Sequence, residues 1–103
     1  MDPSDTRLQV TESDGRVVLS GEIDASTCVM LGDWLDRYDN VGPLVLDMSE
    51  VSFIDSSGLR VLVAQHQKST EHGNAFEVVE ASPAARRLFE ITGLAEVLGV
   101  RST

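Results

Sequence analysis

The sequence predicts a single α/β domain in which a mixed, mostly parallel β-sheet with an N-terminal hairpin has helices packed against it. Two observations predict this class. The chain opens with two strand-like segments around a turn signal, and short apolar segments then alternate with segments of helical period. Because 103 residues is the length of one small domain, we expect one domain over residues 1–103, with its core at about residues 8–100.

The beginning of the chain predicts a hairpin and then a helix. Residues 8–12 alternate apolar and polar side chains, residues 13–15 are a turn signal, and residues 16–20 are typical of the returning strand. The apolar period then changes to three and four, and we expect a helix that is capped by Asp24 or Ser26. The side chains on its apolar face are Cys28, Leu31, Leu35 and Tyr38.

The middle of the chain predicts a buried strand and a second helix. Residues 44–48 form a short apolar run that is typical of a strand buried on both faces. Residues 51–54 are an apolar connection that leads to Asp55, and Gly73 is the expected end of the helix that follows. The inward-facing side chains of that helix are Leu59, Leu62, Val63 and His66.

The last third predicts a strand, a helix and a short final strand. Residues 76–79 are the strand, and Ser82 followed by Pro83 is a strong signal for a helix start. Gly93 is the expected end of this helix, and residues 97–100 are the expected final strand. The apolar side chains that line the helix are Leu88 and Ile91.

The charge balance excludes several classes of function. Eight basic residues against 17 acidic ones give a net charge of −9, whereas direct binding to nucleic acid or to an anionic membrane needs a basic surface. The apolar runs are too short to cross a membrane and the N-terminus lacks the pattern of a signal peptide, so we expect a cytoplasmic protein. The single cysteine, Cys28, excludes an internal disulfide and a multi-cysteine metal site. We expect no cofactor.

Residues 53–60 are the segment with the most unusual chemistry. They place two adjacent hydroxyls, Ser56 and Ser57, at the predicted start of a helix, where unpaired backbone N–H groups favour an anion. A phosphoryl group there would add a charge of about −1.5 to −2 without necessarily melting the helix. Judged by spacing alone, the commoner explanation is that Asp55 or Ser56 caps the helix and that Gly58 allows close packing.

The segments that carry a family resemblance occur in the right order along most of the chain, from about Leu8 to Val100. They resemble the STAS domain and, more narrowly, the stand-alone anti-sigma factor antagonists of bacteria. The run Asp-Ser-Ser-Gly-Leu after an apolar segment is the specific part of the match. The matching segments are residues 21–24, residues 46–49 with 53–59, residues 82–83 with 87–89, and residues 92–94.

The resemblance implies a binding protein that is not an enzyme and that exchanges partners. In that family the unphosphorylated domain binds an anti-sigma factor and so releases a sigma factor. The anti-sigma factor is also a serine kinase, its phosphorylation of the domain ends the complex, and a separate serine phosphatase resets the switch. The phosphoacceptor that the resemblance implies is Ser56, with Ser57 as the fallback.

The resemblance also implies where the partner binds. Asp24 matches an acidic position that lies beside the phosphoacceptor in the family. We therefore expect the following residues around Ser56 to form the partner-binding surface: Glu22, Asp24, Asp55, Ser57, Gly58 and Arg60. The three acidic residues among them would make this surface negative before any phosphate is added.

Arg60 departs from the family pattern, because a small residue is expected after Leu59. It follows Ser56 by four residues and therefore shares its face of the predicted helix. We hypothesise that a phosphate on Ser56 pairs with Arg60 in the same chain.

Other functions fit the sequence less well. A serine hydrolase would need a histidine close to Ser56, but His66 lies roughly 15 Å along the helix axis and the motif Gly-x-Ser-x-Gly is absent. The sequence also lacks the glycine-rich P-loop of many nucleotide-binding proteins. Two alternatives stay open: a STAS subunit of a lipid-transport or stress-signalling complex, and a small nucleotide-binding protein of flavodoxin-like topology.

Overall fold

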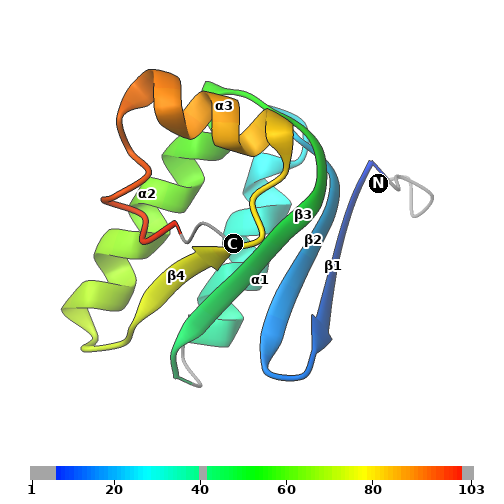
Figure 1. Ribbon diagram of the computed structural model, residues 1–103. Coiled ribbons are helices and arrows are strands. Elements are labelled where there is room, and N and C mark those ends of the chain that lie inside the picture. Colours follow the sequence, from blue (N-terminus) through cyan, green and yellow to red (C-terminus); the bar gives the residue numbers. More distant parts are fainter. Residues whose placement is uncertain (1–6, 40–41, 101–103) are drawn as a thin grey trace.

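A four-stranded mixed sheet with helices packed against it forms the fold, as the sequence predicts (Figure 1). The computed structural model describes residues 7–39 and 42–100. The elements in chain order are β1 (Leu8–Ser13), β2 (Arg16–Ile23), α1 (Cys28–Asp39), β3 (Leu44–Ile54), α2 (Ser56–Glu71), β4 (Phe76–Val79) and α3 (Pro83–Thr92).

The strands lie in the order β1-β2-β3-β4. β1 and β2 form the predicted antiparallel hairpin, and β2, β3 and β4 run parallel to one another. The carboxyl ends of β2 and β3 therefore meet at one edge of the sheet, where α1 and α2 begin. This edge is called the carboxyl edge below.

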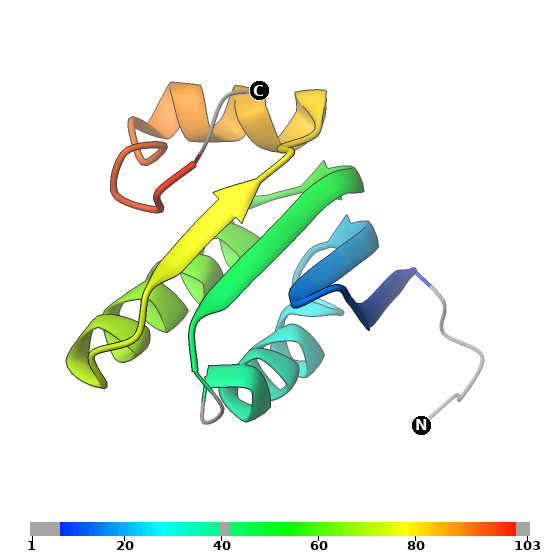
Figure 2. The same ribbon diagram turned by 60° about the horizontal axis from the view of Figure 1, so that its bottom comes forward.

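The helices are placed unequally around the sheet. α1 and α2 lie side by side on one face, whereas α3 packs against β3 at the carboxyl edge (Figures 1 and 2). The core lies between the sheet and these helices, and its largest fully buried side chains include Leu19, Ile23, Leu31, Leu35, Leu46, Met48, Leu62 and Phe89.

The sequence predictions for β3 were wrong in two respects. Residues 51–54 are not a connection but the second half of an 11-residue strand. They continue to pair with β2 after two register shifts, as far as Ile54 opposite Ile23. The first half of β3 is not buried on both faces, since Val45 and Asp47 are only half-buried. In the described part of the chain, α1 and α2 cover only one face of this half of β3 (Figure 1).

The predicted final strand is also wrong. Residues 97–100 contribute only an isolated bridge between Val100 and Val78, because their backbone is used in turns. The N–H of Leu98 donates to the Leu94 carbonyl, and the N–H of Val100 donates to the Ala95 carbonyl. These local hydrogen bonds replace those of a regular strand.

The predicted caps of α3 are confirmed, whereas parts of three predicted helix faces need correction. Ser82 caps α3 through the N–H of Ala85, and Gly93 ends the helix in the left-handed conformation. On α3, Ile91 is exposed, and the buried side chains are Ala85 and Phe89. On α1, Cys28 is half-buried and Thr27 just before it is buried; on α2, His66 is half-buried and Gln65 is buried. The errors lie at the margins of the faces of α1 and α2, because Leu31, Leu35, Leu59 and Leu62 are buried as predicted. Spacing alone does not resolve which residue borders a helix face.

Candidate functional site

Ser56 is the first residue of α2 and is exposed to solvent. The N-cap of the helix is the residue before it. Asp55 has an extended backbone and its Oδ1 accepts hydrogen bonds from the N–H groups of Ser57, at 2.9 Å, and Gly58, at 3.3 Å. Of the two caps that the sequence allows, the structure therefore uses Asp55. The hydroxyl of Ser56 is displayed at the surface instead of serving the helix.

The start of α2 is packed tightly against the end of β2. A Cβ on Gly58 would collide with Cγ2 of Ile23. The N–H of Asp55 also donates to the carbonyl of Ile23 at 3.2 Å. The first contact explains why glycine is needed at position 58. Together, the two contacts place Ser56 beside the segment that follows β2.

Asp24 is the centre of that segment and organises the turn that leads into α1. Its Oδ1 accepts hydrogen bonds from the N–H groups of Ser26, at 2.9 Å, and Thr27, at 3.1 Å. The buried hydroxyl of Thr27 donates to the carbonyl of Glu22 at 2.9 Å. Asp24 thus caps the turn just before the helix, and its side chain is fixed in position.

Arg7 is the residue at this edge that the sequence did not predict. Its Nη1 lies 3.6 Å from Oδ2 of Asp24, the carboxylate oxygen that the turn does not use; the two side chains are 44% and 19% exposed. The arginine backbone is held as well, since its carbonyl accepts a hydrogen bond from the N–H of Glu22 at 2.6 Å. Arg7 and Asp24 are 17 positions apart, so only the pairing of β1 with β2 brings them together. The predicted acidic cluster therefore contains a cation.

The other predicted residues lie on the elements that meet here. Arg60 is exposed on the first turns of α2, and Ser57 is half-buried behind Ser56. Glu22 is the register partner of Phe53, on neighbouring strands, and both follow the bulge that precedes Ile23. The structure therefore brings Glu22, Asp24 and Asp55 to the same edge as Ser56.

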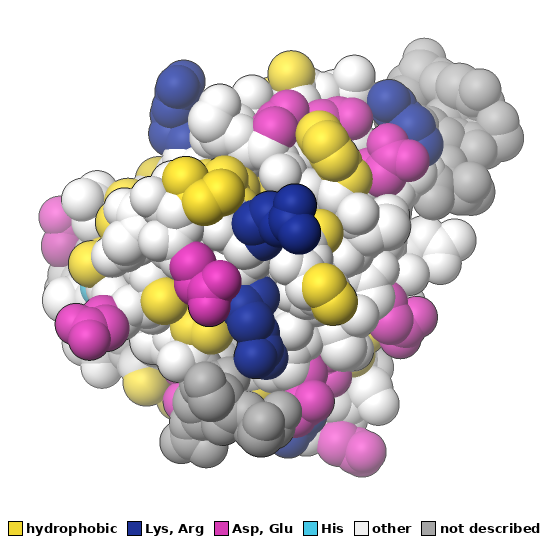
Figure 3. Space-filling view, turned by 45° about the horizontal axis from the view of Figure 1, so that its top comes forward, with side chains coloured by type: hydrophobic (Ala, Val, Ile, Leu, Met, Phe, Trp, Pro, Cys, Tyr) yellow, Lys and Arg dark blue, Asp and Glu magenta, His cyan; other side chains and the backbone are white. Residues whose placement is uncertain are grey.

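Large apolar side chains are exposed around the same edge. Phe53 is 47% exposed at the end of β3, and Val29 and Met30 are exposed in the first turn of α1. The first turns of α1 and α2 lie at the same level, because Gly32 faces Val61 across the two helices. Figure 3, which brings the carboxyl edge forward, shows hydrophobic side chains scattered among acidic and basic ones. Such a mixture is typical of a protein-binding surface.

The site provides Ser56 with no histidine to act as a base. His66 lies in the third turn of α2, where its ring packs edge-on against Phe76 with ring centroids 5.5 Å apart, and His72 caps the far end of the helix. These positions argue against the hydrolase arrangement, which needs a histidine within hydrogen-bond reach of the hydroxyl.

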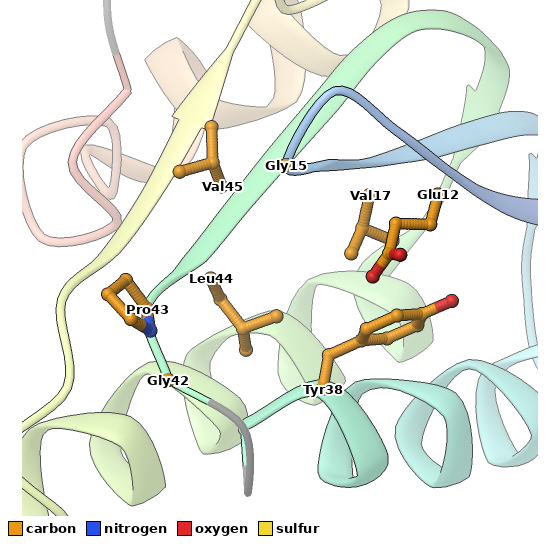
Figure 4. Close-up of a pocket in the computed structure, with 8 residues that line it drawn as sticks. All are labelled: Glu12, Gly15, Val17, Tyr38, Gly42, Pro43, Leu44 and Val45. Atoms are coloured by element: carbon orange, nitrogen blue, oxygen red, sulfur yellow. The ribbon is translucent and has the colours of Figure 1, made fainter.

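A hollow of about 200 Å³ lies at the opposite edge of the sheet, where β3 begins (Figure 4). Tyr38 from the end of α1 and Leu44 from β3 line it together with Glu12 and Val17 of the hairpin. None of the residues predicted around Ser56 takes part in it, so the hollow is separate from the site.

The fold and the site together define a small binding module that displays a serine at a helix start. The family model for the STAS domain matches residues 6–103. The chain therefore belongs to the STAS domain family. In the part of the chain that the structure describes, no helix combines the length and the apolar character that a membrane span requires.

Individual relatives narrow the comparison. An anti-sigma-B factor antagonist of Listeria monocytogenes is 33% identical over 88 residues, which are 84% of this chain and 77% of the relative. The anti-sigma-F factor antagonist RsfB of Mycobacterium tuberculosis is 33% identical over 105 residues, covering 98% of this chain and 85% of the relative. The crystal structure of an anti-sigma factor antagonist from Mycobacterium paratuberculosis superposes with a TM-score of 0.76 at 35% identity, covering 93% of this chain and 85% of that one.

Proposed function

We propose that this chain is an anti-sigma factor antagonist: its unphosphorylated form binds an anti-sigma factor and thereby releases a sigma factor. The names of its relatives support this function over a STAS subunit of a lipid-transport or stress-signalling complex, and over a nucleotide-binding protein of flavodoxin-like topology. The observation that carries the proposal is the exposed Ser56 at the capped start of α2.

Phosphorylation of Ser56 switches the binding off. Because Asp55 caps α2 through the N–H groups of Ser57 and Gly58, a phosphate on Ser56 leaves these hydrogen bonds intact. The helix start also favours an added negative charge. The modification therefore changes the charge of the surface and not the fold, and it acts on the protein that docks there.

The partner binds over the carboxyl edge. Its contacts include Glu22, Asp24, Asp55, Ser57, Gly58 and Arg60, and the exposed Phe53 supplies an apolar contact beside them. A dianionic phosphate at the centre of this surface would lie in a region that the partner removes from water. Burying an uncompensated charge in this way costs several kcal/mol, and about 1.4 kcal/mol is already tenfold in affinity.

The anti-sigma factor is also the kinase, and the ATP of the reaction belongs to that partner. A serine phosphatase removes the phosphate and restores binding. In this scheme the chain itself has no catalytic role: it is the substrate of both enzymes and the ligand of one.

Mass spectrometry after incubation with a cognate anti-sigma kinase and ATP tests the proposal. One phosphate per chain on Ser56 is the expected result, and Ser56→Ala should remove it while Ser57→Ala should not. A phosphate that persists in Ser56→Ala and disappears in Ser57→Ala would transfer the role to the fallback serine. No phosphate in any variant would refute the switch.

A further inference from the structure

We propose that Arg7 is a counter-cation for the phosphate on Ser56, exchanging from Asp24 to the phosphate when the switch is set. This deepens the proposed function, because it assigns a regulatory residue to the same site and rests on phosphorylation at Ser56. It adds a component from the start of the hairpin, just before β1, where none of the residues expected at the partner-binding surface lies.

The backbone of Arg7 is fixed where it can serve the site. Its carbonyl accepts the N–H of Glu22 at 2.6 Å. It also sits over Gly21, where a Cβ would collide with that carbonyl and where φ is +114°. The end of β2 thus has no room for a side chain at position 21, and the start of the hairpin is held directly against it. The proposed exchange changes only the direction of the long side chain of Arg7, which is 44% exposed.

One ion pair and one hydrogen bond connect Arg7 and the start of α2 to the same segment. The guanidinium of Arg7 contacts Asp24, and the carbonyl of Ile23 accepts the N–H of Asp55. The residue before Asp24 is therefore joined to the residue before Ser56. Arg7 and the residue before Ser56 therefore both contact the segment of residues 23–24.

Asp24 can lose the arginine without losing its structural role. Its Oδ1 holds the turn through Ser26 and Thr27, and only Oδ2 faces Arg7. A phosphate has up to twice the charge of a carboxylate and offers three oxygens to a guanidinium. The exchange therefore needs a rotation of one exposed side chain and no movement of the backbone.

The charged residues near Ser56 determine how readily Arg7 can pair with a phosphate there. On β2 and its loop the acidic groups are Glu22 and Asp24, and Asp55 precedes α2. The cations on the neighbouring elements are Arg7 before β1, Arg60 on α2, and the exposed pair Arg86 and Arg87 on α3. Three acids lie at the same edge as Ser56, and their charges oppose the second ionisation of a phosphate there, whereas a nearby cation favours it. Arg7 is the cation already drawn to this cluster by an ion pair.

The experiment is a phosphorus NMR titration of the full chain with phosphoserine incorporated at position 56 during translation. Arg7→Gln is expected to raise the second pKa of the phosphoserine by about 0.8, the effect of one charge at roughly 4 Å in water. Arg16→Gln is the matched control. Arg16 forms an Arg–Asp pair with Asp47 at the same 3.6 Å and with nearly the same exposure, but at the other end of β2. It should change the pKa by less than about 0.1.

The same titration separates Arg7 from the other cations. Arg60→Gln and Arg87→Gln are measured in parallel, since either residue would serve as the counter-cation if Arg7 does not. Equal shifts for Arg7→Gln and Arg16→Gln would mean a general charge effect and would overturn the proposal. So would a shift that appears with Arg60→Gln or Arg87→Gln and not with Arg7→Gln.

A double-mutant cycle tests the exchange itself. Asp24→Asn should lower the phosphoserine pKa, both by removing an acid and by releasing Arg7 to the phosphate. If the exchange occurs, this decrease becomes smaller in the Arg7→Gln background, whereas equal decreases in the two backgrounds would contradict it. Because phosphoserine is installed without a kinase, the result does not depend on phosphorylation by a partner. Failure of the kinase assay would therefore refute phosphorylation of Ser56 as the switch, whereas failure of the titration would refute Arg7 as the counter-cation.

Discussion

The two ends of β2 carry the same interaction in different surroundings. At the carboxyl edge Arg7 faces Asp24, and at the amino end Arg16 faces Asp47; both pairs have an N–O distance of 3.6 Å, and the arginines are 44% and 47% exposed. The first pair adjoins the start of α2 and Ser56, whereas the second adjoins the hairpin turn. The comparison teaches that an ion pair gains a function from what the fold places beside it.

The largest expected effect concerns the glycines of the two ends. Gly21 has φ of +114° and a Cβ there would overlap the Arg7 carbonyl, whereas Gly15 in the hairpin turn has φ of +79° and open space around it. Gly21→Ala should lower the free energy of unfolding by about 3 kcal/mol or more, because conformational strain and a backbone collision add. Gly15→Ala should lower it by only about 1 kcal/mol, from strain alone.

Chemical denaturation of the two variants measures the difference. If Gly21→Ala does not fold, its failure beside a folded Gly15→Ala supports the prediction equally well. Similar stabilities for the two alanine variants would show that the start of β1 moves away freely, and the fixed position of Arg7 would then be wrong.

The second prediction concerns the charge at Ser56. Ser56→Asp should weaken binding to the cognate anti-sigma factor by at least about tenfold, since a charge is placed where the partner excludes water. Ser56→Ala should retain the affinity of the unmodified chain. Gln67→Glu is the control for added charge, because Gln67 is exposed on α2 well beyond its first turns. Calorimetric titration gives the three affinities, and equal values for Ser56→Asp and Ser56→Ala would contradict the switch.

The third prediction concerns the apolar part of the surface. Phe53 and Val97 are both 47% exposed, but only Phe53 lies at the end of the strand that leads to Ser56. Phe53→Ala should weaken partner binding by about 1 kcal/mol, roughly fivefold, which is typical of a contributing aromatic contact. Val97→Ala should leave binding unchanged. Equal losses for the two variants, in the same titration, would place the docking surface elsewhere.

The sequence predicted what is encoded locally. Asp55, Ser82 and Gly93 act within one turn of their helices, so their neighbours in the chain are sufficient to assign them. The alternation of strands and helices likewise predicted the mixed sheet and the helix start at which Ser56 lies. The resemblance to the family added the role of Ser56, which spacing alone left undecided between a switch and a cap.

What the sequence did not predict depends on contacts between distant segments. Arg7 meets Asp24 only because the hairpin register places the start of β1 beside the end of β2. The length of β3 depends on register shifts against β2. The apolar residues 51–54 would fit either a connection or a strand, so their pattern did not distinguish the two. Residues 97–100 form turns instead of a strand because local hydrogen bonds satisfy their backbone groups.

The smallest expected effect is on the stability of the two ion pairs. Arg7→Gln and Arg16→Gln should each lower the free energy of unfolding by less than about 1 kcal/mol, because both arginines are nearly half-exposed and surface pairs contribute little. Urea denaturation of the unphosphorylated chain should give the two variants the same midpoint within error. Equal midpoints for the two variants are needed to interpret the phosphoserine titration. If the two pairs are equivalent for folding, a shift confined to Arg7→Gln arises from the phosphate and not from a loosened structure. A much less stable Arg7→Gln would instead make that arginine a structural residue of the carboxyl edge.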